Sequence, residues 1–363
     1  SMRSYTSNVV FFNNTVAPYR IPMFNKVVKI LAQNSIITEV VFLSEKESVR
    51  NWNVDYSQIN FDYEILPTLF QKRNSNTTTS DFIVNRGFFK YLASDVVVLF
   101  GYNYPTYLII IFLRKLLGRK TVLFSESTQS DKPRVKGLKH TVKSFIIGKL
   151  FSSYIVPGLE AKEFIKSYGV HDSAISIAEN AVEGFVEPKI KKSDSDYINI
   201  LYVGRLAEEK NVGFLLASIP DNHSYNYRVV VVGSGPEEAK LQKIPVQYPV
   251  EFKGFREGNE LTKIFFEADV FVLPSQSEPW GLVVNEAINA GLAVLVSDRV
   301  GCRHELVKNN GRIFKLNDKV DFQNKLLEIT SNIDNCKESS RKMSKIFTLD
   351  NQASKIAKAI KNA

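Results

Sequence analysis

The chain has 363 residues, of which 44% are hydrophobic, and a formal charge of +9. This length exceeds what one hydrophobic core usually covers, so two domains of about 150 to 200 residues are expected. The two cysteines are too few for a disulfide framework or a thiolate metal cluster, which favours a reducing compartment. No window approaches the roughly 18 apolar residues of a membrane span, and no signal-peptide pattern is visible, so we expect a soluble cytoplasmic protein.

The positive charge is concentrated in the first half. Residues 1–180 contain 22 Lys and Arg against 14 Asp and Glu, whereas the rest of the chain is nearly balanced. The density is highest between Arg114 and Lys149, where basic residues alternate with apolar ones such as Leu138 and Val142. Such a segment can lie on an anionic membrane surface, on the inner face of the membrane. An amphipathic core helix with a solvated basic face explains the pattern equally well.

Short β-branched runs alternate with helical patterns along the chain, which is typical of βαβ units in a parallel sheet. The first series of strands is expected at residues 8–12, 38–43, 62–66, 95–100, 121–124, 154–156 and 174–178. The second is expected at residues 198–203, 227–232, 250–253, 270–273 and 293–296, with closing helices at 321–330 and 350–360. We therefore predict an α/β protein with two Rossmann-like, doubly wound parallel-sheet domains that face each other across a cleft.

A charged stretch at residues 187–196 is almost free of apolar side chains and predicts a linker. The expected domains are residues 1–185 and 186–344, with a last helix at about 345–363 that packs back on the first domain. Residues 71–80 are polar without an apolar period and predict a mobile surface loop.

The loop after the first strand of the second series contains Gly204, Arg205 and Lys210. Gly204 would let a ligand approach the backbone, and the two cations lie where a diphosphate would need neutralising. The alternative is a solvated loop in which Arg205 pairs with Glu208 or Glu209.

The next two strands end at glycine-containing turns. Gly233 and Gly235 form a Gly-x-Gly turn without the third glycine of the dinucleotide fingerprint, so it would at most let a nucleotide pass close to the backbone. Phe255 follows another strand, and the backbone there could bond a base edge, although an ordinary strand exit explains it as well.

Two carboxylates, Glu278 and Glu286, flank a glycine-opened helix start. The free amides of Gly281, Leu282 and Val283 would favour a phosphate or a sugar hydroxyl. Glu286 lies about a turn and a half into the helix, where a carboxylate can accept from vicinal ribose hydroxyls. The alternative, a solvated helix face, is disfavoured because the neighbouring residues are mostly apolar.

In the first half, Asn14, Tyr19 and Arg20 lie on the irregular loop after the opening strand and are expected to bind an acceptor. Glu126 follows a later strand and would face the cleft, although it could instead pair with a neighbouring base. The four histidines are scattered without metal-ligand spacing, and Asp194 and Asp196 lie in the linker, so no metal site is predicted.

These loops together resemble glycosyltransferase family 4, the retaining, nucleotide-sugar-dependent group 1 enzymes with the GT-B fold. The resemblance rests on Gly204-Arg205 with Lys210-Asn211, on Gly233-Ser234-Gly235-Pro236, and on Ser277-Glu278-Pro279-Trp280-Gly281-Leu282 through Glu286. It covers the second half of the chain. It implies that Arg205 and Lys210 bind the diphosphate, that Glu278 reaches the donor sugar and that Glu286 holds the ribose.

The first half matches this family less closely. Asn13 and Asn14 stand where many relatives carry a glycine pair, and the histidine that many relatives place near the reacting sugar has no obvious counterpart here. Glu126 is the residue expected to act in that region.

The resemblance implies transfer of a hexose from a nucleotide diphosphate sugar to a glycan or lipid-linked acceptor, in bacterial surface polysaccharide or lipopolysaccharide synthesis. It also implies a front-face displacement that needs no metal or other cofactor. Another GT-B sugar-nucleotide enzyme, such as an epimerase or a phosphorylase-like protein, is the alternative enzyme. A non-catalytic binder of anionic surfaces is a different class, and nucleic acid is not an expected partner because no aromatic-basic platform is present.

Overall fold

The computed structural model describes residues 7–46, 53–72, 81–129, 136–189, 196–221 and 224–363. The chain divides into two compact units. Unit 1 consists of Ser1–Ser127, Arg134–Glu179 and Leu349–Ala363, and unit 2 consists of Thr128–Pro133 and Asn180–Thr348. Among the helices in the described ranges, none is both long enough and apolar enough to cross a membrane.

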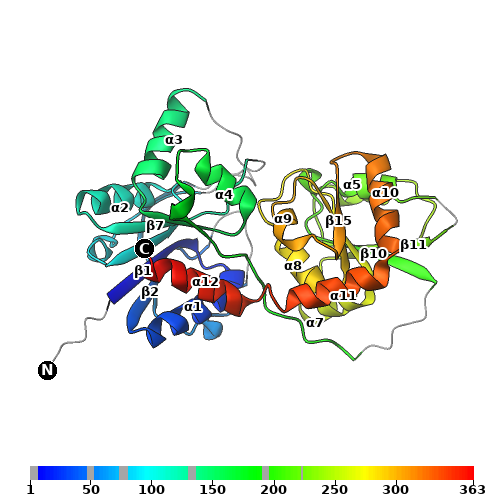
Figure 1. Ribbon diagram of the computed structural model, residues 1–363, viewed down its shortest axis with the longest axis horizontal. Helices are drawn as coiled ribbons and strands as arrows, with labels where there is room; N and C mark the ends of the chain where they lie inside the picture. Colours follow the sequence, from blue (N-terminus) through cyan, green and yellow to red (C-terminus); the bar gives the residue numbers. More distant parts are fainter. Residues whose placement is uncertain (1–6, 47–52, 73–80, 130–135, 190–195, 222–223) are drawn as a thin grey trace. The chain divides into compact units, whose positions relative to one another are not determined.

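Unit 1 is built on a seven-stranded parallel sheet with the strand order β3-β2-β1-β6-β7-β8-β9 (Figure 1). The strands are β1 (Ser7–Thr15), β2 (Ile36–Ser44), β3 (Tyr63–Ile65), β6 (Val96–Phe100), β7 (Lys120–Phe124), β8 (Ser153–Val156) and β9 (Ile175–Ile177). All seven coincide with the expected first series to within a few residues. The middle residues of the central strands are apolar and buried because helices cover both faces of the sheet.

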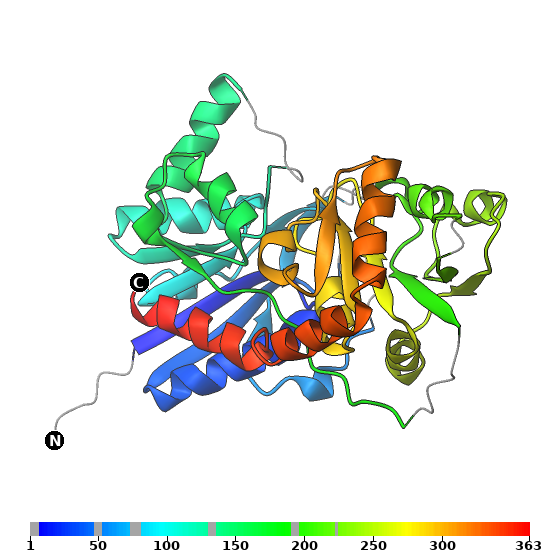
Figure 2. The ribbon, with the colours of Figure 1, turned by 45° about the vertical axis from the view of Figure 1, so that its right-hand side comes forward.

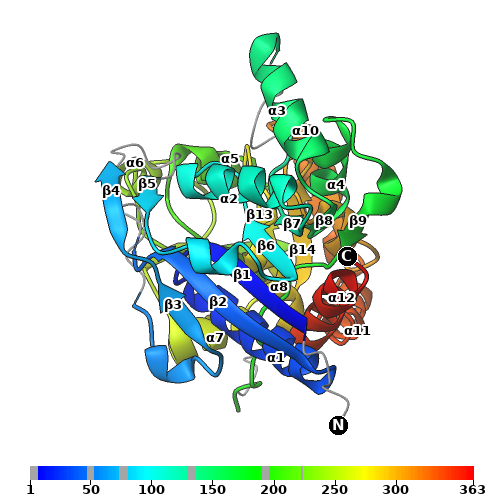
Figure 3. The ribbon, with the colours of Figure 1, turned by 90° about the vertical axis from the view of Figure 1, so that its left-hand side faces the viewer.

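Helices α1 and α12 lie side by side on one face of this sheet, and α2, α3 and α4 lie on the other (Figures 1 and 3). Their bounds are α1 (Ile21–Gln33), α2 (Pro105–Leu116), α3 (Leu138–Lys149), α4 (Leu159–Lys166) and α12 (Leu349–Lys361). Lys26 in α1 forms an ion pair of 2.8 Å with Asp350 in α12. The last helix of the chain therefore belongs to the first unit, as Figure 2 shows for the red helix beside the blue one.

A small antiparallel hairpin was not predicted. It consists of β4 (Thr68–Lys72) and β5 (Phe82–Asn85), and β5 packs against α2. The expected loop at residues 71–80 is therefore wrong at its start, because Gln71 and Lys72 pair with β5. The rest of that expected loop, residues 73–80, lies outside the described ranges.

Four short 3-10 helices complete unit 1, and one lies in unit 2. They are η1 (Pro18–Arg20), η2 (Tyr56–Gln58), η3 (Phe89–Tyr91), η4 (Asp172–Ala174) and, in unit 2, η5 (Glu208–Lys210). Two of them, η1 and η5, contain candidate site residues.

Unit 2 has a six-stranded parallel sheet with the order β12-β11-β10-β13-β14-β15. The strands are β10 (Tyr197–Val203), β11 (Asn226–Val232), β12 (Val250–Gly254), β13 (Val270–Leu273), β14 (Ala293–Ser297) and β15 (Gly311–Phe314). The helices are α5 (Val212–Ser218), α6 (Glu238–Gln242), α7 (Gly258–Glu267), α8 (Leu282–Asn289), α9 (Arg303–Leu306), α10 (Lys319–Thr330) and α11 (Ile333–Ser344). Neither β15 nor α11 was predicted from the sequence.

The order of the strands in unit 2 reverses between β10 and β13, which are neighbours in the sheet. In doubly wound sheets, ligands bind beside the carboxyl ends of the strands at this switch point. The loops that follow β10 and β13 are those that carry Arg205, Lys210 and Glu278. The topology therefore brings two distant parts of the sequence to one edge.

Candidate active site

Lys210 and Glu278 form an ion pair at the switch point of unit 2. Their side chains approach to 2.6 Å between Nζ and Oε2, and they are 22% and 16% exposed. Lys210 ends η5, and Glu278 lies on the loop between β13 and α8. An ion pair this far from bulk water is screened less than a surface pair, so each charge holds the other in position.

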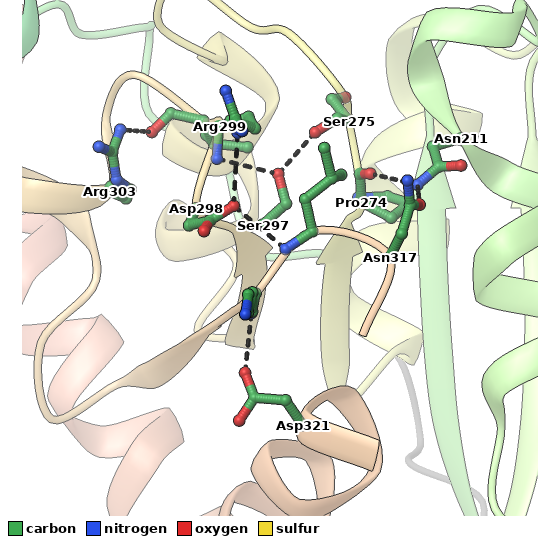
Figure 4. A network of polar contacts seen from close by, with 12 residues as sticks. Asn211, Pro274, Ser275, Ser297, Asp298, Arg299, Arg303, Asn317 and Asp321 are labelled. Atoms are coloured by element: carbon green, nitrogen blue, oxygen red, sulfur yellow. Dashed lines mark hydrogen bonds and ion pairs between the residues drawn. The ribbon is translucent and has the colours of Figure 1, made fainter. Parts of the chain in front are cut away.

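Two buried serines support Glu278. The hydroxyl of Ser275 donates to Oε2 of Glu278 at 3.2 Å, and the hydroxyl of Ser297 donates to the carbonyl of Ser275 at 2.6 Å. Figure 4 shows this link between the loop after β13 and the end of β14. Both serines are fully buried, so the loop that carries Glu278 is fixed from within the unit. Neither serine was singled out from the sequence.

Asn211 ties the loop after β10 to the end of β13. It adopts a left-handed conformation with φ of +60°, and its Nδ2 donates to the carbonyl of Pro274 and to Oδ1 of Asn317, both at 3.0 Å (Figure 4). Asparagine is one of the few residues that tolerate this conformation. Its position directly after Lys210 in the motif was the signal that could have revealed this role.

Arg205 is exposed and forms no ion pair within the part of the chain that the structure describes. The alternative in which it pairs with Glu208 or Glu209 is therefore not realised. Its own carbonyl accepts from the hydroxyl of the buried Tyr202 at 2.8 Å, which fixes the backbone at this point. Because the backbone of Arg205 is fixed and its guanidinium makes no ion pair among the described residues, this side chain is suited to binding an anion.

Two glycines at this edge of the sheet are required by close contacts within the protein itself. A Cβ on Gly233 would lie 1.8 Å from the carbonyl oxygen of Gly204, and a Cβ on Gly204 would lie 2.6 Å from the hydroxyl of Tyr202. Both also have positive φ angles, +139° and +159°. The expectation that Gly204 only clears space for a ligand is thus incomplete, because the protein itself fills that space.

Phe255 stands next to these glycines. It directly follows β12, is 64% exposed, and the preceding Gly254 accepts a hydrogen bond of 2.9 Å from the amide of Gly233. An exposed aromatic ring beside a strand end is available to stack on a planar ligand.

Helix α8 begins at Gly281, which has a φ of +102°. The amide of Val284 bonds to the carbonyl of Gly281, whereas no carbonyl among the described residues accepts from the amides of Gly281, Leu282 or Val283. Those three amides are therefore available at the positive end of a helix.

Glu286 lies in the middle of α8 and is half-buried. Its carboxylate has no hydrogen-bond or ion-pair partner in the described ranges, and burial raises the pKa of this carboxyl to about 7. The helix exposes Leu282, Val283 and Glu286 partly and buries its other face. A carboxylate that is desolvated and unpaired can accept hydrogen bonds from ligand hydroxyls.

The opposite face of α8 is held by a buried polar chain. Nε1 of Trp280 donates to Oδ1 of Asn285 at 2.8 Å, and Nδ2 of Asn285 donates to the carbonyl of Asn180 at 2.9 Å. Trp280 and Asn285 are 4% and 3% exposed. This chain fixes the rotation of α8 and, with it, the direction of Glu286.

In unit 1, Arg20 and Glu126 form an ion pair of 3.1 Å. The guanidinium of Arg20 is stacked 5.0 Å from the rings of Phe100 and Phe124, and its side chain is only 8% exposed. Burial would lower the pKa of Arg20, but Glu126 and Tyr19 raise it, and the net direction is upward. The side chain of Arg20 is therefore held by contacts within unit 1, whereas the side chain of Glu126 is 31% exposed.

The other two predicted acceptor residues are Tyr19 and Asn14. Tyr19 is 39% exposed, and the guanidinium of Arg20 lies 5.2 Å from its ring centroid. Nδ2 of Asn14 donates to the hydroxyl of Tyr104 at 3.1 Å. Asn13 is buried, and its Nδ2 has no acceptor in the described part of the chain.

The basic segment between Arg114 and Lys149 does not form one continuous basic face. Arg114 is fully buried and donates to the carbonyls of Leu92 and Ser94 at 2.8 and 2.7 Å. Burial lowers the pKa of its guanidinium to about 10. The expectation that Arg114 contacts a membrane is therefore wrong, because it serves as an internal crosslink. The basic residues Lys132 and Arg134 lie outside the described ranges.

No group of three or more His, Cys, Asp or Glu side chains with metal-binding geometry occurs in the residues that the structure describes. Asp194, one of the two aspartates in the expected linker, lies outside those ranges, as does His223.

A cavity of about 500 Å³ lies away from this edge. It is lined by one face of the sheet toward the amino end of β10, including Asn199 and Arg228, and by Asp269 and Lys337, which form an ion pair with each other. Its charges of both signs indicate no particular ligand.

Part of the chain matches a known protein family. A family model described as "Glycosyl transferases group 1" matches residues 185–346. Unit 2 is a group 1 glycosyltransferase domain. The match contains the candidate site residues of unit 2, from Gly204 to Glu286.

Two curated relatives align with part of the chain. The O-antigen biosynthesis glycosyltransferase WbnH of Escherichia coli is 29% identical over 195 residues, which cover 54% of this chain and 55% of that protein. Sulfoquinovosyl transferase SQD2 of Arabidopsis thaliana is 36% identical over 132 residues, which cover 35% of this chain and 25% of that protein. The chain thus aligns with between a quarter and about half of the length of these relatives.

The fold likeness extends beyond the glycosyltransferase domain. The crystal structure of Anabaena Alr3699/HepE in complex with UDP and glucose matches with a TM-score of 0.69 and 13% identity over 98% of this chain and 100% of that chain. This match includes both units, which confirms the predicted GT-B fold class with its two Rossmann-like parallel-sheet domains.

Proposed function

We propose that the protein is a retaining glycosyltransferase that transfers a hexose from a nucleotide diphosphate sugar to a glycan or lipid-linked acceptor. The observation that carries this proposal is the arrangement around the switch point of unit 2. There the Lys210–Glu278 pair, the free guanidinium of Arg205 and the unpaired carboxyl of Glu286 all belong to loops or helices at one sheet edge.

The donor is held by groups of complementary chemistry. Arg205 and Lys210 neutralise the diphosphate, and the amides of Leu282 and Val283 donate to its oxygens or to the sugar. Glu278 accepts from hydroxyls of the donor sugar, and Glu286 accepts from the vicinal hydroxyls of the ribose. Phe255 offers its exposed ring to the base.

The transfer follows from these positions. The acceptor oxygen attacks the anomeric carbon from the face that the diphosphate leaves, and the bond between that carbon and the phosphate oxygen breaks. The bonding electrons pass to the diphosphate, whose oxygen takes the proton of the acceptor hydroxyl. Arg205 and Lys210 stabilise the charge that develops on the leaving group, so the reaction requires no metal. Glu126 acts on the acceptor side.

The similar proteins support the classes of donor and acceptor. HepE was solved with UDP and glucose, and WbnH acts in O-antigen biosynthesis. We therefore propose a nucleoside diphosphate hexose as donor and a surface polysaccharide or lipopolysaccharide intermediate as acceptor. The enzyme would work in the cytoplasm as a peripheral protein on the inner face of the membrane.

The test begins with the full chain and a thermal-shift screen of UDP, GDP and their sugars. A ligand of the folded state raises the melting temperature, by an amount that grows with its concentration over Kd. The selected sugar nucleotide is then used to measure turnover by the wild type and by Arg205→Ala, which leaves the fold intact because Arg205 is exposed and unpaired.

We expect Arg205→Ala to lower turnover about 100-fold, which is the scale of one lost charge contact in a transition state. The matched control is Arg341→Ala, another exposed arginine of unit 2, which pairs with Glu338. Equal turnover by the two variants would contradict the site, and the absence of any shift with every nucleotide would contradict the proposed function.

A further inference from the structure

Helix α3 has a row of apolar side chains turned away from unit 1. The side that faces the unit is mixed: His140 stacks on Tyr168 at 5.2 Å, a Cβ on Gly148 would lie 2.8 Å from the carbonyl oxygen of Tyr168, and Ile146 and Ile147 pack on the core. Ile147 is the one buried residue of the helix. The opposite row consists of Leu138, Val142 and Phe145, which are 80%, 49% and 55% exposed.

In the usual amphipathic helix the apolar residues pack on the core, as Ile147 does here, but α3 carries this second apolar row on its exposed side. A helix of about 12 residues is marginal in water without such packing. Figure 3 shows α3 projecting beyond the rest of unit 1. Its outward row is therefore suited to a partner outside the unit.

Helix α2 lies on the same side of the sheet as α3 (Figures 1 and 3) and also exposes apolar residues. The side chains along its outer face and just after its end are between 38% and 68% exposed, and they are Leu108, Ile109, Phe112, Leu116 and Leu117. We call this row of α2, together with the outward row of α3, the α2–α3 surface. An exposed apolar area of this kind marks an interaction site.

The charges on the two helices favour an anionic partner. Neither α2 nor α3 contains Asp or Glu, whereas Lys115, Lys139 and Lys149 are exposed along or at the ends of these helices, and Lys136 is exposed just before α3. A second copy of the chain would bring the same positive charges against each other, which is unfavourable. A bilayer with anionic lipids accepts both features, because its interior takes apolar side chains and its headgroups pair with lysines.

We propose that the α2–α3 surface docks on an anionic lipid bilayer, with Leu138, Val142, Phe145 and Phe112 entering the boundary of the headgroups. This inference rests on the peripheral location in the proposed function and names the surface responsible. The surface differs from the basic segment expected from the sequence, because it includes the outer face of α2 and excludes the buried Arg114.

The test is sedimentation of the full chain with vesicles of two compositions. One is phosphatidylcholine with about 30% phosphatidylglycerol, which approximates a strongly anionic leaflet. The other is phosphatidylcholine alone. We expect the wild type to bind the anionic vesicles. Leu138→Ser/Phe145→Ser should bind them at least about tenfold more weakly. The matched control is Val320→Ser/Ile346→Ser, which removes two apolar residues of unit 2 that are 67% and 59% exposed.

A second variant, Lys136→Glu/Lys139→Glu, keeps the apolar row and reverses two charges. Glutamate near a helix start favours the helix, so lost binding could not be assigned to an unfolded α3. We expect a loss of about fivefold or more for each lysine. Lys308→Glu/Lys342→Glu, on exposed lysines of unit 2, gives the same net charge and should bind as the wild type does.

Unchanged vesicle binding in both α3 variants would overturn the proposal. It would also be overturned if light scattering showed a dimer that Leu138→Ser/Phe145→Ser converts to a monomer, because a second copy would then cover the surface. Binding of UDP-sugars, measured by thermal shift on the same variants, separates the two proposals. Vesicle binding without nucleotide binding would leave the surface valid and contradict the proposed function.

Discussion

The side chains of Lys210 and Glu278 meet at 2.6 Å although 68 residues separate them in sequence. They meet because β10 and β13 are adjacent parallel strands, and their following loops leave the same edge of the sheet. This pair connects the cation expected at a diphosphate with the carboxylate expected at a sugar.

The pair gives the first prediction. Lys210→Ala should lower turnover of the sugar nucleotide by about 100-fold to 1000-fold, because a cation beside the developing negative charge is lost. Stability should fall only slightly, since Glu278 keeps the hydroxyl of Ser275 as a partner. Initial rates and a urea titration measure the two effects. Lys240→Ala, an exposed lysine that pairs with Glu237, is the control and should behave as the wild type does.

Glu286 gives a prediction on pH. Burial raises the pKa of its carboxyl to about 7, and only the ionised form accepts two bonds from ribose. Donor affinity should therefore fall about tenfold between pH 8 and pH 6, as the ionised fraction falls from about nine-tenths to one-tenth. Calorimetric titration with a nucleoside diphosphate at both values measures this change. In Glu286→Gln the affinity should be lower and nearly independent of pH; a slope equal to that of the wild type would assign the titration to another group.

Arg114 gives a prediction on stability. Its guanidinium donates to main-chain carbonyls at the starts of β6 and β7, so Arg114→Ala leaves several buried carbonyls without a donor. We expect the free energy of unfolding to fall by about 3 kcal/mol or more. Chemical denaturation followed by circular dichroism provides the value. Arg119→Ala, at a side chain that is 44% exposed, should cost less than about 1 kcal/mol.

Gly233 gives a prediction on the backbone. In Gly233→Ala, the new Cβ would lie 1.8 Å from the carbonyl oxygen of Gly204 at a φ that alanine rarely adopts. The loops after β10 and β11 must then separate, and we expect a loss of about 2 kcal/mol or more together with weaker donor binding. Gly184→Ala is the control, because nothing lies within 4 Å of the added carbon and its φ is not positive. Similar melting temperatures of the two variants would show that the close approach is not required.

Glu126 gives a prediction on the acceptor side. Glu126→Gln removes the charge while the rest of the Arg20 environment stays, including the rings of Phe100 and Phe124. We expect transfer to the acceptor to fall about 100-fold, with little change in the KM for the donor. Rates measured at saturating donor over a range of acceptor concentrations give both constants. A raised KM for the donor with a normal rate of transfer would contradict this prediction and indicate that Glu126 contacts the donor.

Local sequence patterns predicted the strands of both sheets well, because an apolar run bounded by Gly or Pro can be recognised without its neighbours. The same patterns missed β15 and the β4–β5 hairpin, whose strands are short and partly exposed. Helix α11 was missed because it is mostly polar and is stabilised by its contact with α8 rather than by its own composition.

The residue types of the proposed donor site were also available from the sequence, since Arg205, Lys210, Glu278 and Glu286 lie in loops or a helix that follow predicted strands. The contacts that these residues make in the folded protein were not available from the sequence. Sequence spacing suggested that Arg205 pairs with a nearby glutamate, whereas the structure leaves it unpaired among the described residues and pairs Lys210 with Glu278 instead. The support from Ser275 and Ser297 depends on strand neighbours that no local pattern shows.

The sequence by itself therefore determined the two-sheet architecture and the chemical character of the donor loops, because both depend on apolar periods and residue types that are local. Only the tertiary structure decided that Arg20 and Arg114 are internal, that Gly204 and Gly233 lie too close to other groups of the protein to carry a side chain, and that one apolar row of α3 faces outward. These properties depend on which groups are brought within a few ångströms of one another across long stretches of chain. Burial and pairing are set by that proximity, and proximity is set by the order of the strands.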